Sequence, residues 1–88
     1  MEFEYDPSKS KSNFLKHGIN FVDAQQLWLD ERRLEIQSRN NIEEPRWVII
    51  GCIGELIWAA INTKRTNRIR IISVRRARNE EKELYYGE

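Results

Sequence analysis

The side chains best suited to chemistry on a phosphate lie in the second half of the chain. Between Lys64 and Arg78 there are seven positive side chains and no negative one. Six of the seven are arginines, whose planar guanidinium fork matches phosphate oxygens better than the point charge of lysine does. The whole chain has a net charge of +1, so the remaining residues together carry −6. This imbalance predicts a local site for an anion, not a generally basic protein.

Three further side chains could complete a site that cleaves RNA without a metal. The reaction needs a base for the 2′-hydroxyl proton, an acid for the leaving 5′-oxygen, and cations beside the pentacoordinate phosphate. Histidine exchanges protons near neutral pH, so His17 could serve as acid or base, and Glu81 could be a base or orient an arginine. Tyr85 could stack on an unpaired base or donate to a phosphate. General acid and base groups each contribute about 10² to 10⁴ in rate.

Each of these side chains also has a structural interpretation. His17 could interact with the carbonyl groups that end a helix, and Glu81 could simply stabilise the first turn of a helix. An amphipathic last helix would bury Tyr85. Arg70 and Arg75 could pair with Glu81 or other carboxylates, although we favour phosphate contacts for these two arginines.

Several other kinds of site are excluded by what the chain lacks. It has one histidine and one cysteine, with no grouping suited to zinc, and its acidic pairs lack the spacing of a calcium loop. Its four glycines form neither a P-loop nor a dinucleotide fingerprint. Cys52 lies in the middle of a predicted strand and is expected to be a small buried side chain. We therefore expect no metal and no cofactor.

The same composition bears on where the protein works. The longest apolar run, Trp47 to Ile50, is far shorter than the roughly 20 residues of a membrane helix. The acidic start differs from the basic start of a secretory signal, and a lone cysteine cannot form an internal disulfide. These features favour the cytoplasm and no membrane association.

Hydrophobic patterning predicts an α+β chain with the order strand, two helices, four antiparallel strands, helix. The expected elements are 3–5, 7–17, 20–29, 34–37, 47–53, 56–63, 68–74 and 79–86, with a polar loop at 38–45 and turns at 54–55 and 64–67. Asp6 and Gly18 should cap the first helix at its two ends, and Asn20 and Asn79 should cap the other two.

Strand 68–74 matters most because it holds part of the basic segment. Regular alternation would place Arg68, Arg70, Ile72 and Val74 on one face. Ser73 would then face away from Arg70, so we expect it to pack or to hydrogen-bond locally.

Two dense motifs give the chain a resemblance to a known family. The first runs from Phe3 through Lys9 and continues with Asn13, Lys16-His17-Gly18, Phe21 and Ala24. The second runs from Arg70 to Arg75 and is followed by Ala77, Glu81 and Tyr85, while Arg46 precedes the predicted central strand and Gly51 lies within it. These motifs resemble the BrnT-type toxins. Tyr5 and Asn20 depart from the commonest residues of that family, Trp and Ser, at positions that look structural.

The resemblance implies a single RelE-like toxin domain over residues 1–88, with an antiparallel sheet of about four to five strands, two N-terminal helices and one C-terminal helix. It implies an endoribonuclease that cleaves mRNA and blocks translation, neutralised by a cognate antitoxin, commonly of the ribbon-helix-helix type. Operator DNA would be bound only through the toxin–antitoxin complex.

The residues and the resemblance together give a set of candidate site residues. The catalytic candidates are His17, Arg70, Arg75 and Glu81, and the RNA-binding candidates are Lys9, Lys16, Arg68, Arg76 and Tyr85. Two alternatives stay open: a module that holds nucleic acid through Lys64–Arg78 without cutting it, and an interaction domain that docks an acidic partner on the same segment. Composition alone favours the nucleic-acid module, and the motifs favour the toxin.

Overall fold

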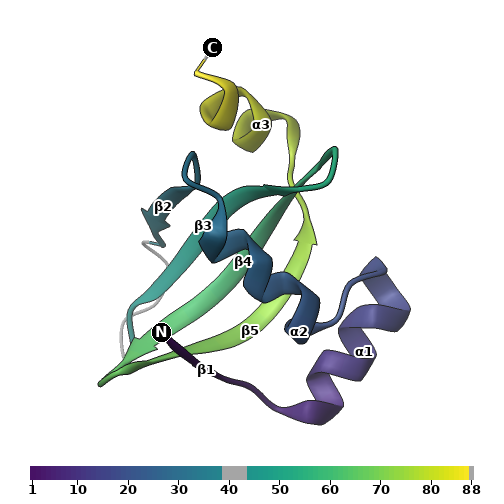
Figure 1. Cartoon of the computed structure of the whole chain (residues 1–88), viewed down its shortest axis with the longest axis vertical. Helices are drawn as coiled ribbons and strands as arrows, with labels where there is room; N and C mark the ends of the chain where they lie inside the picture. Colours follow the sequence, from purple (N-terminus) through teal and green to yellow (C-terminus); the bar gives the residue numbers. More distant parts are fainter. Residues whose placement is uncertain (39–43, 88) are drawn as a thin grey trace.

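The fold is built on one five-stranded sheet with helices at one edge and on both faces (Figure 1). The computed structural model describes residues 1–38 and 44–87. The elements are β1 (Glu2–Glu4), α1 (Pro7–His17), α2 (Phe21–Ala24), η1 (Gln25–Leu29, a 3-10 helix), β2 (Leu34–Gln37), β3 (Arg46–Ile53), β4 (Leu56–Arg65), β5 (Arg68–Arg76) and α3 (Asn79–Tyr86). The predicted α+β class, the helices at both ends of the chain and the strand count are confirmed.

The strands follow the order β1-β5-β4-β3-β2, and every neighbouring pair except β1 with β5 is antiparallel. The parallel pair is short, since Glu2 to Glu4 lie opposite Arg68 to Arg70 only. In the described part of the chain, the second half of β5 therefore has no strand on its outer side. Helix α1 lies along that free stretch (Figure 1).

Polar side chains, not apolar ones, attach α1 to the rest of the fold. The buried residues of this helix are Ser10 and Asn13. Ser10 Oγ accepts a hydrogen bond from the backbone N–H of Phe21 at 2.9 Å. Asn13 Nδ2 donates to the carbonyl of Ile19 at 2.8 Å, while its Oδ1 accepts from the N–H of Val74 at 3.1 Å. Asn13 thus satisfies an edge amide of β5 and fixes the turn after α1 at the same time.

The main core lies on the sheet face that α2 and η1 cover. All four residues of the predicted stripe, Phe21, Ala24, Leu27 and Trp28, are buried there with residues of the sheet. The helix predicted for 20–29 is only partly correct, because after one α turn it becomes 3-10. It passes close over Gly51, where an added Cβ would lie 3.2 Å from a Leu27 methyl carbon and 3.4 Å from the Leu27 carbonyl oxygen.

A bulge changes the faces of β5 from those predicted. Ile61 pairs with Ser73 but its neighbour Asn62 pairs with Ile71, so Ile72 is an extra residue in β5. Ile71 and Val74 both belong to the main core as a result. The predicted placement of Val74 beside Arg70 was therefore wrong, and so was the placement of Ser73 on the opposite face. Beyond the bulge, Ser73 and Arg75 share the face that Arg70 occupies before it.

The opposite sheet face carries α3 at one end. Ile50, Ile57 and Ala77 form a second small core there, with Tyr85 packed against it. No residue of α3 itself is buried. The helix is capped by Arg78, one residue earlier than the predicted Asn79.

Other boundaries differ from the predictions by a few residues. The strands around the second hairpin are longer than predicted, so the turn shrinks to residues 66–67, with Asn67 at φ 65°. Of the predicted polar loop 38–45, residues 39–43 lie outside the described residues. Within the described ranges, no helix is long and apolar enough to cross a membrane.

Replacing Asn13 by Ala should destabilise the protein by about 2 to 6 kcal/mol, because two buried backbone groups lose their partners at a cost of about 1 to 3 kcal/mol each. The better helix propensity of Ala offsets only a few tenths of this. Urea unfolding of Asn13→Ala and the wild type measures the difference. Lys11→Ala, an exposed position on the same helix, is the control and should stay within about 0.5 kcal/mol of the wild type. Equal stability of all three proteins would contradict the attachment of α1 through Asn13.

Candidate functional site

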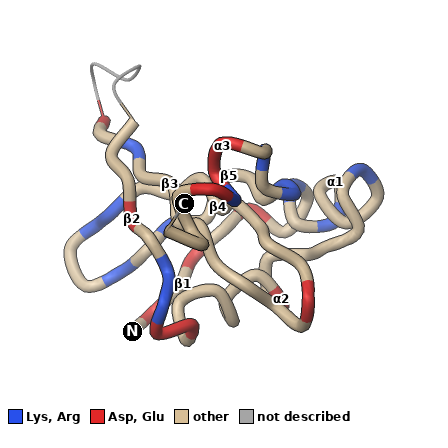
Figure 2. Tube along the Cα trace, turned by 90° about the horizontal axis from the view of Figure 1, so that it is seen from above, with Lys and Arg blue, Asp and Glu red and all other residues tan. Residues whose placement is uncertain are grey.

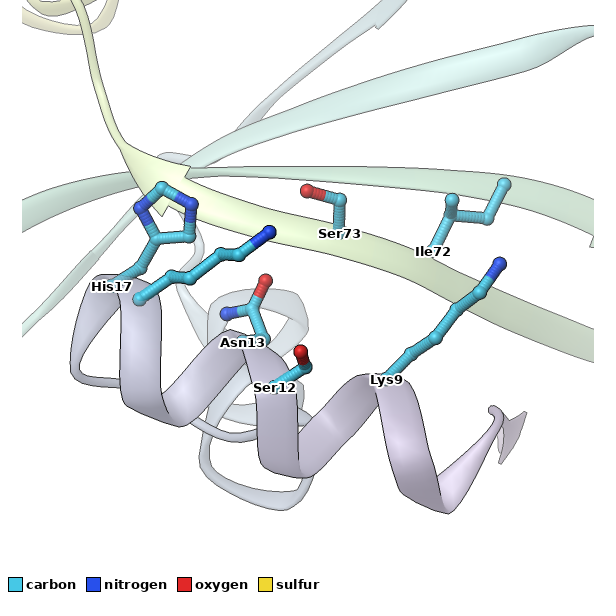
Figure 3. Close-up of a pocket in the computed structure, with 7 residues that line it drawn as sticks. Lys9, Ser12, Asn13, His17, Ile72 and Ser73 are labelled. Atoms are coloured by element: carbon cyan, nitrogen blue, oxygen red, sulfur yellow. The ribbon is translucent and has the colours of Figure 1, made fainter.

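A groove of about 200 Å³ separates α1 from the edge of β5. Its lining residues are Lys9, Ser12, Asn13, Lys16, His17, Ile72 and Ser73. In Figure 3, Lys9 and His17 stand at the two ends of the groove along α1, and Ser73 projects from β5 on the side away from that helix. The site combines three predicted residues from the first motif with two strand residues from the second.

Helical spacing explains why α1 lines the groove with these side chains. Ser12 and Asn13 both lie three or four residues after Lys9 and three or four residues before Lys16, so the four side chains form one stripe on the helix. On the other wall, Ile72 and Ser73 both line the groove although they are consecutive. A regular strand would send two consecutive side chains to opposite faces, so the bulge is what brings both to this wall.

His17 is the last residue of α1. Gly18 ends the helix with φ 79°, and its N–H donates to the carbonyl of Phe14 at 2.9 Å. The structural alternative for His17 was an interaction with the carbonyl groups at the end of the helix. In the structure, the backbone amide of Gly18 makes such an interaction instead. Among the described residues, no hydrogen bond or ion pair involves the imidazole, which leaves both ring nitrogens available to a ligand.

The groove is positively charged. Lys9 and Lys16 form no ion pair within residues 1–38 and 44–87, and the sequence of α1 contains no acidic residue. The blue of Lys and Arg along α1 in Figure 2 is accordingly not interrupted by red. Two ammonium groups, two hydroxyls and an imidazole in one groove suit a phosphate group.

Four of the six arginines of the basic segment, by contrast, have acidic partners. Arg68 lies 3.4 Å from a Glu2 oxygen and Arg70 lies 3.0 Å from a Glu4 oxygen. Both contacts follow from the parallel pairing of β1 with β5, which sets these residues opposite each other. Arg76 lies over the ring of Trp58, 5.6 Å from its centroid. None of these arginines lines the groove.

Arg75 makes the strongest of these ion pairs. Its two terminal nitrogens donate to the two Glu81 oxygens at 2.7 and 2.9 Å, and the backbone N–H of Arg78 donates to the same carboxylate at 2.8 Å. The hydrogen bonds from Arg75 hold the pKa of Glu81 below its ordinary value, against the opposing effect of burial. The same hydrogen bonds raise the pKa of Arg75. The fork joins the end of β5 to the first turn of α3.

The hydroxyl of Tyr85 also has a carboxylate as its hydrogen-bond partner. Its hydroxyl donates to Asp30 Oδ2 at 2.6 Å, and the backbone N–H of Cys52 donates to the same oxygen at 2.8 Å. Burial, together with this hydrogen bond, raises the pKa of Tyr85 to about 12. Burial alone would raise the pKa of Asp30, but the hydrogen bonds from Tyr85, Arg32 and Cys52 together lower it. Tyr85 thus holds α3 against β3 and lies outside the groove.

Of the nine predicted site residues, the groove contains Lys9, Lys16 and His17, while Arg68, Arg70, Arg75, Arg76, Glu81 and Tyr85 lie outside it. Ser12 and Ser73 line the groove but were not among the candidates. The position of Ser12 between the two lysines on one helical stripe could have indicated it. Ser73 depends on a bulge, whose signal in the sequence is the pair Ile71-Ile72, where the alternation of polar and apolar residues changes phase. Among the described residues, no three His, Cys, Asp or Glu side chains form a group that could hold a metal ion.

Comparison with known protein families identifies the chain. A sequence model described as "Ribonuclease toxin, BrnT, of type II toxin-antitoxin system" matches residues 5–81. The chain belongs to the BrnT family. No protein with a curated description matches it. The resemblance inferred from the two motifs is confirmed, and BrnT membership makes this chain a ribonuclease toxin of a type II system. Such a toxin has RNA as its substrate and a protein antitoxin as its partner.

The fork between Arg75 and Glu81 should make the stability of this BrnT-family chain depend on acid pH. The folded pKa of Glu81 lies below its ordinary value of 4.5, so its stabilisation is present above that value and is lost as the pH falls through the folded pKa. At pH 7, Glu81→Gln should cost about 1 to 3 kcal/mol. The deficit should shrink as the pH falls below 4.5.

Urea unfolding at a series of pH values measures both effects. The exposed first-turn neighbour supplies the control, because Glu80→Gln should lose only a few tenths of a kcal/mol at pH 7. A deficit for Glu81→Gln that stayed constant down to pH 2 would show that the carboxylate charge does not contribute.

Proposed function

We propose that this chain is a metal-independent endoribonuclease that cleaves mRNA at the groove between α1 and β5 and so stops translation. We further propose that it works in the cytoplasm as one RelE-like domain and is neutralised by a cognate antitoxin of the ribbon-helix-helix type. The observation that carries the proposal is the cluster of Lys9, Lys16 and His17, none of which has an acidic partner in the described residues. In a ribonuclease family, such a cluster is suited to the scissile phosphate.

The chemistry assigns one task to each kind of side chain. A base removes the proton of the 2′-hydroxyl, whose oxygen attacks phosphorus while the bond to the 5′-oxygen breaks. An acid gives a proton to that leaving oxygen. The products are a 2′,3′-cyclic phosphate and a 5′-hydroxyl end, and no oxidant or other reactant is needed. His17 is the proton-transfer group in the groove, and Lys9 and Lys16 stabilise the extra negative charge of the transition state.

The hydroxyls and the amide of the groove position the substrate. Ser12 and Ser73 line the groove from opposite walls, so their hydroxyls can donate to phosphate oxygens from both sides. Asn13 is a positioning residue, because its amide already bonds Ile19 and Val74 and sets the distance between the two walls. Because the width of the groove is fixed, the hydrogen-bond donors on its two walls can bind the phosphate without moving first.

The proposal also covers three predicted site residues that lie outside the groove, namely Arg70, Arg75 and Glu81. Beyond the bulge, Arg75 shares the face of Ser73, and Arg70 precedes the bulge on that same face. RNA that leaves the groove across this face would meet both guanidinium groups. Its phosphates must compete with Glu4 and Glu81 there, so these arginines bind flanking nucleotides less strongly than unpaired arginines would.

Cleavage of a labelled single-stranded RNA by the purified chain tests the proposed site. His17→Ala should lower the cleavage rate by about 10² to 10⁴. Lys9→Ala with Lys16→Ala should lower it by at least about tenfold, with a smaller dependence of RNA binding on salt because two cationic contacts are lost. Lys82→Ala, on α3 away from the groove, is the matched control for loss of a lysine and should cleave at the wild-type rate.

Three outcomes would contradict the proposal, each in a different way. Loss of cleavage on addition of EDTA would overturn metal independence. Full activity of His17→Ala would remove this groove as the catalytic site. Retarded RNA with no cleaved product would indicate the non-catalytic nucleic-acid module instead. Analysis of the 3′ ends checks the cyclic phosphate, and arrest of growth and translation on expression without antitoxin checks the role as a toxin.

A further inference from the structure

The outward side of α1 is more apolar than the side that faces the protein. Phe14 is 51% exposed and Leu15 is 77% exposed, whereas the residues that this helix buries are Ser10 and Asn13. Apolar side chains usually form the inner face of a surface helix. In α1 the polar Ser10 and Asn13 attach the helix to the rest of the fold. The two large apolar side chains lie beside each other on its outer side.

A positive charge accompanies this apolar pair. Lys11 precedes Phe14 by three residues and Leu15 by four, so its ammonium group borders both on the helix surface. Lys11 has no ion pair within the described ranges, and α1 contains no carboxylate to balance it. We call Lys11, Phe14 and Leu15 the outer α1 surface. Its chemistry is complementary to an acidic segment with an apolar stripe.

We propose that the outer α1 surface is where the antitoxin binds, through an acidic amphipathic helix of that protein. The inference rests on the proposed function, because it takes from it that the chain has an antitoxin. Phe14 offers a ring on which a base could stack, but Leu15, the more exposed of the two side chains, offers none, and an aromatic beside an aliphatic side chain suits the apolar stripe of a helix better than a run of bases. A second copy of this chain is also disfavoured, because a two-fold contact of α1 with α1 would bring lysines against lysines.

Binding at this surface would also account for inhibition. His17 follows Phe14 by three residues, so this end of the groove borders the outer α1 surface. An acidic helix lying on Phe14 and Leu15 would place carboxylates beside His17. These carboxylates would compete with RNA phosphate for this end of the groove.

The test uses the double variant Phe14→Gln with Leu15→Gln, in which glutamine keeps helix propensity while removing the apolar contact. The control is Leu29→Gln with Leu84→Gln, two side chains of matching exposure, 80% and 54%, on other elements. The probe is the purified antitoxin encoded beside the gene for this chain, with its affinity measured by calorimetry. The outer-surface variant should bind at least about tenfold more weakly than the wild type, and the control should bind with wild-type affinity.

Cleavage of RNA is measured on the same proteins without antitoxin. We expect both double variants to cleave at the wild-type rate, and the outer-surface variant alone to stay active when antitoxin is added. Lys11→Glu should weaken antitoxin binding as well, by an amount that shrinks at high salt.

The possible failures are distinguishable. Unchanged antitoxin affinity in both the double variant and Lys11→Glu would overturn the proposed surface while leaving the ribonuclease intact. Loss of RNA retardation with unchanged antitoxin affinity would assign the surface to RNA and also overturn the proposal. Absence of cleavage by the wild type would instead refute the proposed function.

Discussion

The candidate site depends on one buried amide, the side chain of Asn13. The outer edge of β5 beyond its short pairing with β1 exposes a backbone N–H at Val74, and Asn13 accepts from it while donating to Ile19. A leucine at this position could bury more apolar area but would leave the strand amide unsatisfied. A hydrogen bond has a defined direction and length. The bond from the Val74 N–H to Asn13 therefore fixes the position of α1 along β5 and the rotation of the helix about its own axis. The groove, with Lys9 on one side of Asn13 and His17 on the other, exists only in that arrangement.

Local signals in the sequence predicted the elements well. Asp6 accepts from Ser8 and Asn20 from Asp23, as their positions before helical segments indicated. Gly18 adopts the left-handed conformation at the predicted end of α1. These features succeed because a cap or a helix end is decided by a few consecutive residues. The stripe of α2 and η1 succeeded for a related reason, since hydrophobic periodicity reports burial directly.

The site was less predictable because its decisive features join distant residues. The bulge at Ile72 arises from the match of β5 to β4, and its trace in the sequence is a shift of the alternation, with polar residues at 68 and 70 before it and at 73 and 75 after it. The partners of Arg70 and Arg68 depend on β1, which lies more than sixty residues earlier in the chain. Charge counting over Lys64–Arg78 therefore overstated the free positive charge of this segment. The unpaired cations of the groove belong to α1, where no acidic residue is available for pairing.

The way α3 is attached also has a consequence for motion. This helix buries none of its residues and is fastened by the Arg75–Glu81 fork at its start and the Tyr85–Asp30 hydrogen bond near its end. Breaking a few side-chain contacts releases the whole helix, while the sheet beneath keeps its backbone pairing. Local opening of this kind costs much less than global unfolding. We therefore expect the amide protons of α3 to exchange with solvent far sooner than those of β4, and Arg75 to be set free whenever the helix opens.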